Sequence, residues 1–90
     1  MKVVFKPSFL KELDKLPFEI NRAVQEICFT IFPRAKNLSQ IHDIDIKPLK
    51  GYKHYYRIRI GNYRVGFKHL NGTVMFIIVL HRKDIYRNFP

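Results

Sequence analysis

Residues 55–68, YYRIRIGNYRVGFK, alternate between polar and apolar side chains. Alternation with a period of two predicts two antiparallel strands, each buried on one face. A turn at Gly61-Asn62 joins them, since both residues accept the positive φ of tight hairpins, and it pairs Arg59 with Arg64. Cross-strand partners share a face, so four basic side chains are predicted on the outer face: Arg57, Arg59, Arg64 and Lys68. The inner face is predicted to hold Tyr56, Ile58, Ile60, Tyr63, Val65 and Phe67.

The positive charges on this outer face are expected to destabilise the sheet. Like charges directly opposite each other destabilise a strand pair, and Arg59 faces Arg64 in the predicted register. No carboxylate lies between Gly51 and Thr73 to neutralise them. The face is therefore either a solvated sheet surface or, as we favour, a binding surface for a negatively charged ligand.

A second hairpin is predicted at Asn71-Gly72, the dipeptide that signals a two-residue turn most strongly. The strand after it, residues 73–80, is apolar on both faces, which is typical of a central strand covered on both sides. The turn pairs Lys68 with Met75 and Arg64 with Val79. In this register the odd-numbered residues of the last strand share the face of Arg64, so His81 is predicted beside the arginines.

The first half of the chain predicts a strand followed by two helices. Residues 2–6 are predicted to form a short strand, and Pro7-Ser8 opens a helix that Pro17 ends. A second helix runs from about Phe18 to Phe32 and is ended by Pro33. Its apolar stripe includes the single cysteine, Cys28, which is expected to be a buried structural thiol. Residues 34–50 show no clear period, and the following side chains are expected to anchor a connection: Ile41, Ile44, Ile46 and Leu49.

These elements describe one α+β domain over residues 1–90. A helical hairpin is predicted to pack on a four-stranded, mainly antiparallel, twisted sheet, in the chain order β-α-α-β-β-β. The first strand is expected beside the last one, which gives the spatial order first, fourth, third, second.

The excess of positive charge indicates which classes of partner the chain is expected to attract. Seventeen Lys and Arg residues stand against seven Asp and Glu residues, a formal net charge of +10. Such a charge predicts salt-sensitive attraction to nucleic acid, to an acidic protein or to an anionic membrane. The longest apolar run, residues 74–80, is far shorter than the roughly 18 residues of a membrane span. No secretory signal opens the chain, so a cytoplasmic protein without a membrane partner is expected.

Candidate chemistry follows the last strand, in the run HRKDIY at residues 81–86. His81 titrates near neutrality and is either an acid or base or a structural cap of the strand. Tyr86 is a candidate base, a stacking surface for an RNA base, or a residue that docks the C-terminal turn. Tyr52, Tyr55 and Tyr56 form either a stacking platform or packing at the sheet edge. Further cations are expected to contact nucleic acid: Lys50, Lys53, Lys68, Lys83 and Arg87.

Three segments carry a family resemblance: LKG at 49–51, YRIRIGNYRV at 56–65 and VLHRKDIY at 79–86. Together with the order of elements, they resemble the RelE/ParE superfamily of toxins from type II toxin–antitoxin systems. The RelE branch comprises ribosome-dependent endoribonucleases that cut mRNA in the ribosomal A site, whereas the ParE branch poisons DNA gyrase. The tyrosine after the HRKD run favours the RelE branch.

The resemblance also implies which residues act. The active site of RelE-like toxins corresponds here to Arg57, Arg59, Arg64, Arg82 and Tyr86, to which His81 is added as a candidate acid or base. Lysines are common in the family where this chain has Arg57 and Arg59, and the terminal segment that carries Tyr86 is short. By resemblance the partners are the ribosome, mRNA and a cognate RelB-like antitoxin that is acidic or amphipathic. Operator DNA would be contacted only through the antitoxin complex.

The predicted chemistry is cleavage of RNA without a metal or another cofactor. The ribose 2′-hydroxyl attacks the adjacent phosphate, which leaves a 2′,3′-cyclic phosphate and a 5′-hydroxyl. Guanidinium groups suit the charge that develops on the phosphoryl oxygens, but arginine is a poor proton shuttle. No paired carboxylates or Cys/His spacing suggests a metal site. Two alternatives stay open: a ParE-like gyrase poison, and an inactive basic module that binds RNA or acts as a corepressor.

Overall fold

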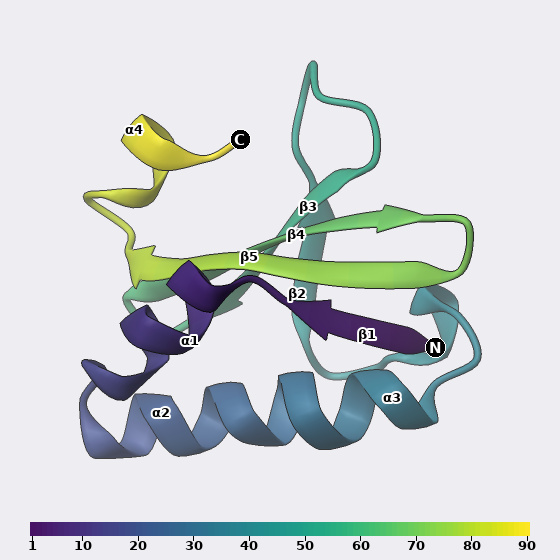
Figure 1. Ribbon diagram of the computed structural model, residues 1–90. Coiled ribbons are helices and arrows are strands. Elements are labelled where there is room, and N and C mark those ends of the chain that lie inside the picture. Colours follow the sequence, from purple (N-terminus) through teal and green to yellow (C-terminus); the bar gives the residue numbers. More distant parts are fainter.

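The computed structural model describes residues 1–90, which form a helical layer on one face of a twisted sheet (Figure 1). In chain order the elements of the first half are β1 (Lys2–Phe5), α1 (Pro7–Asp14), α2 (Phe18–Gln25), the π-helical segment η1 (Glu26–Ile31), α3 (Phe32–Arg34) and the 3₁₀ turn η2 (Leu38–Gln40). The second half holds β2 (Asp45–Pro48), β3 (Tyr55–Ile60), β4 (Tyr63–Leu70), β5 (Thr73–His81) and α4 (Ile85–Asn88). None of the helices is long and apolar enough to cross a membrane.

The sheet confirms the α+β prediction but has five strands, in the order β1-β5-β4-β3-β2. Strand β1 runs parallel to β5, and the other neighbours are antiparallel. The predicted count of four strands is wrong because β2 joins the edge of β3, with Ile46 opposite Ile58. This strand has only four residues and ends at Pro48, which only an edge strand tolerates readily. These properties weakened its pattern in the sequence.

The β3–β4 hairpin has the predicted register, but the β4–β5 pair follows its prediction only in part. Arg59 lies opposite Arg64, and Gly61 takes the positive φ of 57° that its turn requires. In the second pair the register shifts by one residue at a bulge between Gly66 and Phe67, so Arg64 pairs with Leu80 rather than with Val79. A shift of one residue exchanges the two faces of a strand.

The main core lies between the helices and the sheet and is built on phenylalanine rings. Phe32 and Phe76 have ring centroids 5.1 Å apart, and Phe9 lies 5.7 Å from Phe76. All three side chains are fully buried. Cys28 is buried among them as expected, and burial raises the pKa of its thiol. These contacts hold the helical layer on one sheet face, so any site open to ligands on the sheet must use the other face.

The predicted second helix exists as one continuous rod from α2 to α3 (Figure 1). It ends at Arg34 rather than before Pro33. Within it the N–H of Phe32 donates to the carbonyl of Ile27, five residues back, which is a π-helical bond. Pro33 has no N–H to donate, so it is accommodated near the end of the rod without interrupting it.

Helix α1 covers the edge of β5 where β1 ends. Lys6 donates its N–H to the carbonyl of Phe76, and the next edge groups are met by side chains. Ser8 Oγ donates to Ile77 O at 3.4 Å, and Glu12 Oε1 accepts from Val79 N at 3.1 Å. Burial raises the pKa of Glu12, whereas the Val79 N–H and the Lys15 ammonium oppose that shift. Glu12 therefore satisfies a buried backbone donor that the short first strand leaves free.

A smaller cluster occupies the opposite sheet face, where α4 folds back over the strands. It consists of Ile78, Ile85 and Phe89, with Leu49 and Leu80 among the residues that pack against it. The ring of Phe89 rests directly on Gly66, where a Cβ atom would lie only 2.7 Å from Phe89 Cε2. The C-terminal segment can therefore pack here because Gly66, in the middle of β4, has no side chain.

Candidate functional site

The candidate site lies on the sheet face opposite the helices, which we call the arginine face because it carries Arg57, Arg59 and Arg64. Strand pairing alone brings these residues together, since Arg59 lies opposite Arg64 and Arg57 lies opposite Gly66. Lys68 shares the face, with its ammonium 5.5 Å from the centroid of the Tyr55 ring. The four basic residues predicted to share a face therefore do so.

The three arginines of this face differ in how their guanidinium groups are engaged. Arg59 is exposed. Arg57 is half-buried and forms an ion pair with Asp45, with Nη1 2.9 Å from Oδ1. Arg64 is only 9% exposed, and its Nη1 donates to the carbonyls of Gly61 and Tyr63, each at 2.9 Å. Arg64 was predicted to point outward, but its guanidinium is buried and is directed at the carbonyls of the turn.

Asp45 also lies on this face, and it was not among the residues predicted from the sequence. It comes from β2, the strand that was not predicted, and lies opposite Arg59 in the ladder. The hydrogen bond from Arg57 holds the pKa of Asp45 below its ordinary value of 3.8, and the charges of Lys47 and Arg59 act in the same direction. The face thus contains a carboxylate after all. The alternation Ile44, Asp45, Ile46, Lys47 was the signal that would have found it.

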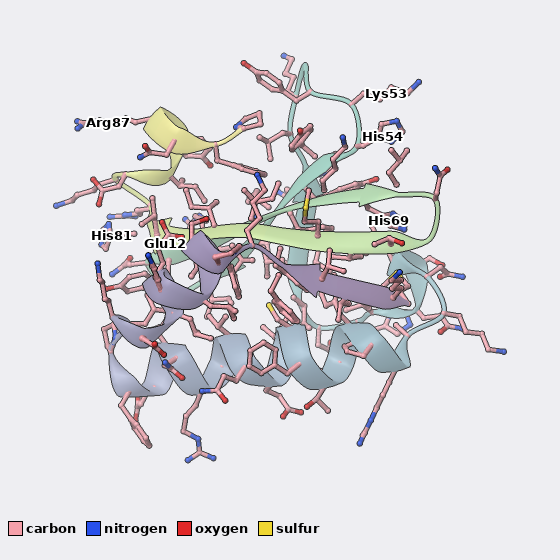
Figure 2. All side chains as sticks on the ribbon, in the orientation of Figure 1. Glu12, Lys53, His54, His69, His81 and Arg87 are labelled. Atoms are coloured by element: carbon pink, nitrogen blue, oxygen red, sulfur yellow. The ribbon has the colours of Figure 1, made fainter.

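His81 does not lie on the arginine face, so its predicted place beside the arginines is wrong. The register shift pairs it with Tyr63, and the two rings meet edge to face with centroids 5.3 Å apart. Its Nδ1 accepts a hydrogen bond from the backbone N–H of Lys83 at 3.2 Å. Figure 2 shows His81 and Glu12 at the end of β5, where both line one hollow on the helical side. His81 caps the turn after β5, the structural alternative left open by the sequence.

Arg82 follows at the same end of the sheet as Arg59 and Arg64. Its side chain is exposed, and its backbone N–H donates to the carbonyl of Asn62 at 2.8 Å. This bond ties the start of the C-terminal segment to the β3–β4 turn. The arginine after the last strand is therefore held next to the hairpin that carries the other three.

Tyr86 projects from α4 and is 67% exposed. It lines a pocket of about 350 Å³ between the C-terminal segment and the loop that follows β2. The residues around this pocket are Leu49, Lys50, Tyr52, Tyr86, Arg87, Phe89 and Pro90. Two of the cations predicted to bind nucleic acid, Lys50 and Arg87, thus lie at one pocket. Lys53 is exposed on the loop and Lys83 in the turn after β5, and Figure 2 shows Lys53 and Arg87 on separate projections from the sheet.

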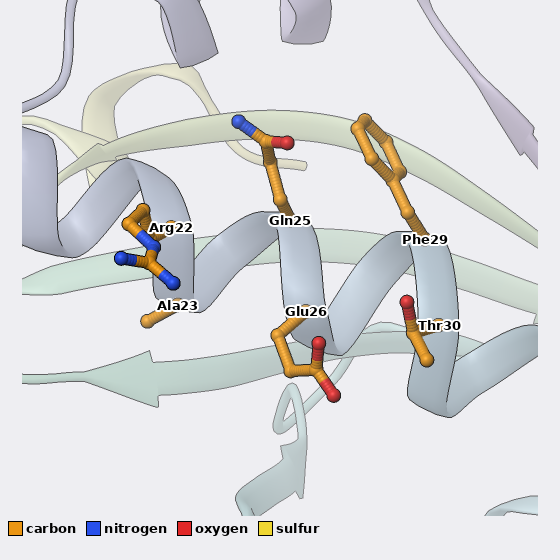
Figure 3. Close-up of a pocket in the computed structure, with 6 residues that line it drawn as sticks. All are labelled: Arg22, Ala23, Gln25, Glu26, Phe29 and Thr30. Atoms are coloured by element: carbon orange, nitrogen blue, oxygen red, sulfur yellow. The ribbon is translucent and has the colours of Figure 1, made fainter.

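A larger hollow, of about 650 Å³, lies on the outer side of the helical layer. Figure 3 shows that the residues lining it project from one helix: Arg22, Ala23, Gln25, Glu26, Phe29 and Thr30. It is separated from the arginine face by the core and the sheet. Nowhere in the chain do three histidine, cysteine, aspartate or glutamate side chains come close enough to hold a metal ion together.

The proteins that are similar to this chain in sequence and in structure are toxins. Residues 3–86 match the family model described as the ParE toxin of type II toxin–antitoxin systems, parDE. The chain is 42% identical over 92 residues to Toxin RelE3 of Methanocaldococcus jannaschii, with 100% of both covered. A chain of the RelB–RelE antitoxin–toxin complex from Methanococcus jannaschii superposes with a TM-score of 0.81 at 38% identity, covering 97% of this chain and 99% of that one. A chain of the toxin–antitoxin complex RelBE2 from Mycobacterium tuberculosis gives a TM-score of 0.66 at 28% identity, covering 90% and 96%.

Proposed function

Because this chain belongs to the RelE/ParE superfamily of toxins from type II toxin–antitoxin systems, we propose that it is a ribosome-dependent endoribonuclease that cuts mRNA in the cytoplasm. The observation that carries the proposal is the gathering of Arg57, Arg59 and Arg64 on one sheet face, with Arg82 at its end. Such a cluster suits a phosphate whose charge grows during the reaction.

In the proposed reaction the ribose 2′-hydroxyl attacks the adjacent phosphate, and the 5′-oxygen of the next nucleotide leaves. The exposed guanidinium groups of Arg59 and Arg82 bind the phosphoryl oxygens and stabilise their added charge. Arg57 is oriented by its ion pair with Asp45, which offsets much of its positive charge. Arg64 acts differently, because its bonds to Gly61 and Tyr63 shape the turn that presents Arg59.

The arginines cannot transfer the proton of the attacking hydroxyl, because guanidinium stays protonated at any working pH. Tyr86 is our candidate for that role, since its exposed side chain lines the pocket that also contains Phe89, whose ring rests on Gly66 in the arginine face. His81 is not assigned to it, because its ring lies on the helical side against Tyr63. Asp45 is not assigned either, because the pKa held low by Arg57 makes it a weak base. Positioning of mRNA by the ribosome supplies the rest of the rate enhancement.

The proposed regulator is a cognate antitoxin that resembles RelB. The relatives described above include toxins solved in complex with RelB antitoxins. A net charge of +10 favours an acidic or amphipathic antitoxin segment that covers the arginine face and blocks mRNA. Operator DNA would then be contacted through the antitoxin.

A second function, poisoning of DNA gyrase, is favoured by the ParE name of the matching family model. Induction of the free chain in cells separates the two. A nuclease should shorten transcripts and stop translation within minutes without a DNA-damage response. Intact transcripts together with DNA-damage signalling would instead establish the gyrase poison, and growth without any defect would leave an inactive binding module. A strain that also expresses the antitoxin serves as the control.

A further inference from the structure

Asp45 is the only acidic residue in the five strands of the sheet. It lies on the arginine face, in β2 at the edge of the sheet, where its neighbours are cations. Asp45 pairs with Arg59, and the next residue of β2 on the same face, Lys47, pairs with Arg57. The core does not need this side chain, because 38% of it is exposed. Its place among cations that suit phosphate therefore indicates a role at the site.

Arg57 reaches past its direct partner to contact this carboxylate. Lys47 lies opposite Arg57, yet Arg57 Nη1 donates diagonally to Asp45, to Oδ1 at 2.9 Å and to the backbone carbonyl at 3.3 Å. Both bonds use the same nitrogen of the guanidinium. Carboxylate and phosphate oxygens accept hydrogen bonds from guanidinium groups in the same way. Asp45 thus occupies a nitrogen of Arg57 that could otherwise bind a phosphate of RNA.

The ion pair lies where it can be exchanged for another anion. The side chains of Arg57 and Asp45 are 17% and 38% exposed. Ion pairs at a surface are weak, because water and dissolved ions compete for both charges. Arg64 differs, since its guanidinium is buried and donates to two carbonyls of its own turn. Arg57 can therefore be released to a phosphate without opening the turn, whereas Arg64 cannot.

An exchangeable carboxylate discriminates between RNA molecules by the way in which they reach the face. A net charge of +10 attracts any RNA, and free RNA has to displace Asp45 in a bimolecular encounter. An mRNA that the ribosome holds against the face presents its phosphate at a high effective concentration, which favours the exchange. The carboxylate therefore weakens the binding of free RNA more than it hinders the reaction on the ribosome.

We propose that Asp45 is a specificity-determining residue, which occupies Arg57 in place of a phosphate and so restrains the binding of RNA that the ribosome does not present. The inference rests on the proposed function, because the RNA that displaces Asp45 during the reaction is the mRNA of that function. Asp45 acts through Arg57 and transfers no proton.

The test measures the binding of free RNA without cleavage. An RNA of about eight nucleotides with 2′-O-methyl sugars lacks the attacking hydroxyl, and its fluorescence anisotropy gives Kd over a range of salt concentrations. Asp45→Asn frees Arg57 for one further phosphate, which should steepen the slope of log K against log salt concentration by about 0.7. At about 0.1 M salt this change corresponds to roughly 5-fold tighter binding than by the parent chain.

Matched variants separate this contact from the change in net charge. Glu26→Gln raises the net charge equally, on the outer side of the helical layer (Figure 3), and should leave the slope unchanged and Kd within about 2-fold. In an Arg57→Gln background, Asp45→Asn should change Kd by no more than about 2-fold, because no guanidinium is left to release. Asp45→Glu, which keeps a carboxylate, should bind like the parent chain. Circular dichroism shows whether each variant is folded, and Asp45→Ala replaces Asp45→Asn if the latter is not.

The outcomes separate this inference from a structural role and from the proposed function. An ion pair that only fastened β2 to β3 would affect Tm and leave the salt dependence of binding as it is. An unchanged slope in the folded variant of Asp45, or an equal gain in Glu26→Gln, would overturn the inference even if mRNA is cleaved on the ribosome. A slope that steepens through Arg57, in a chain that leaves cellular mRNA intact, would support the exchange of Asp45 for phosphate and reject the nuclease.

Discussion

Substitution of Gly66 by alanine tests how the C-terminal segment is seated on the arginine face. The added methyl group would lie 2.7 Å from Phe89 Cε2 and 2.8 Å from both Cδ2 and Cζ. Contacts this short cannot persist, so either the strand or the ring must move. Strand β4 is paired with a neighbouring strand on each side, so we expect Phe89 rather than the strand to move and α4 to loosen with it.

The expected cost follows from the packing of the ring. Inserting a methyl group into a filled site costs about 1–3 kcal/mol. Complete loss of the Phe89 contacts sets an upper limit of roughly 3–5 kcal/mol, the cost of truncating a buried phenylalanine. We therefore expect Gly66→Ala to lower the free energy of unfolding by about 1–3 kcal/mol, which for a chain of this size lowers Tm by roughly 4–24 °C.

A double-mutant cycle with Phe89→Ala isolates this contact. Gly66→Ala should be nearly neutral in the Phe89→Ala background, because nothing remains for the methyl group to meet, so the coupling energy should be about 1–3 kcal/mol. The assay is urea unfolding of the four chains, monitored by circular dichroism. Additive effects would show instead that the ring does not rest on this glycine. Toxicity in cells should fall in parallel with the docking of α4, because Tyr86 is carried by that helix.

Three further predictions concern single hydrogen bonds and charges. The pKa of Asp45 is lowered in the folded chain, so its ion pair with Arg57 stabilises the fold above pH 3.8, and this stabilisation is lost as the pH falls through the lower folded-state pKa. The urea midpoint should therefore fall less between pH 7 and pH 2.5 in Asp45→Asn than in the parent chain. Glu12→Ala leaves the buried N–H of Val79 unpaired and should cost about 1–3 kcal/mol in denaturant unfolding, whereas Glu12→Gln, which keeps an acceptor, should stay close to the parent chain. Arg64→Ala should lose about 1–2 kcal/mol of stability, because two carbonyls of the turn lose their donor. Arg59→Ala should reduce toxicity at unchanged Tm. A stable, non-toxic Arg64→Ala together with a destabilised, fully toxic Arg59→Ala would contradict the roles assigned to the two residues.

The sequence predicted those parts of the fold in which pattern and turn chemistry agree. The β3–β4 hairpin follows from strict alternation and a turn at Gly61-Asn62, and its register is as predicted. Strand β5 is apolar on both faces, and it lies inside the sheet with β1 at its side, as predicted. In these segments local preference and tertiary packing favour the same structure.

The wrong predictions have physical causes that a local sequence pattern does not indicate. The bulge at Gly66 and Phe67 shifts β5 by one residue, and this shift moves His81 to the helical side. Strand β2 is short and ends at Pro48, so Asp45 was missed although it pairs with Arg57. The alternation of Arg64 predicts its face but not the direction of its guanidinium, which depends on the carbonyls that the turn leaves free.

The central claim, cleavage of mRNA by the arginine face on the ribosome, is tested most directly by mapping RNA ends. Purified chain that has been dialysed against EDTA is added to an mRNA in a translating cell-free extract, and primer extension locates the cuts. We expect cuts at the codon in the ribosomal A site, with 2′,3′-cyclic phosphate and 5′-hydroxyl ends. These cuts should require ribosomes and should be lost in Arg59→Ala and Arg82→Ala. Intact mRNA in this assay, with a chain that is folded and toxic in cells, would contradict it.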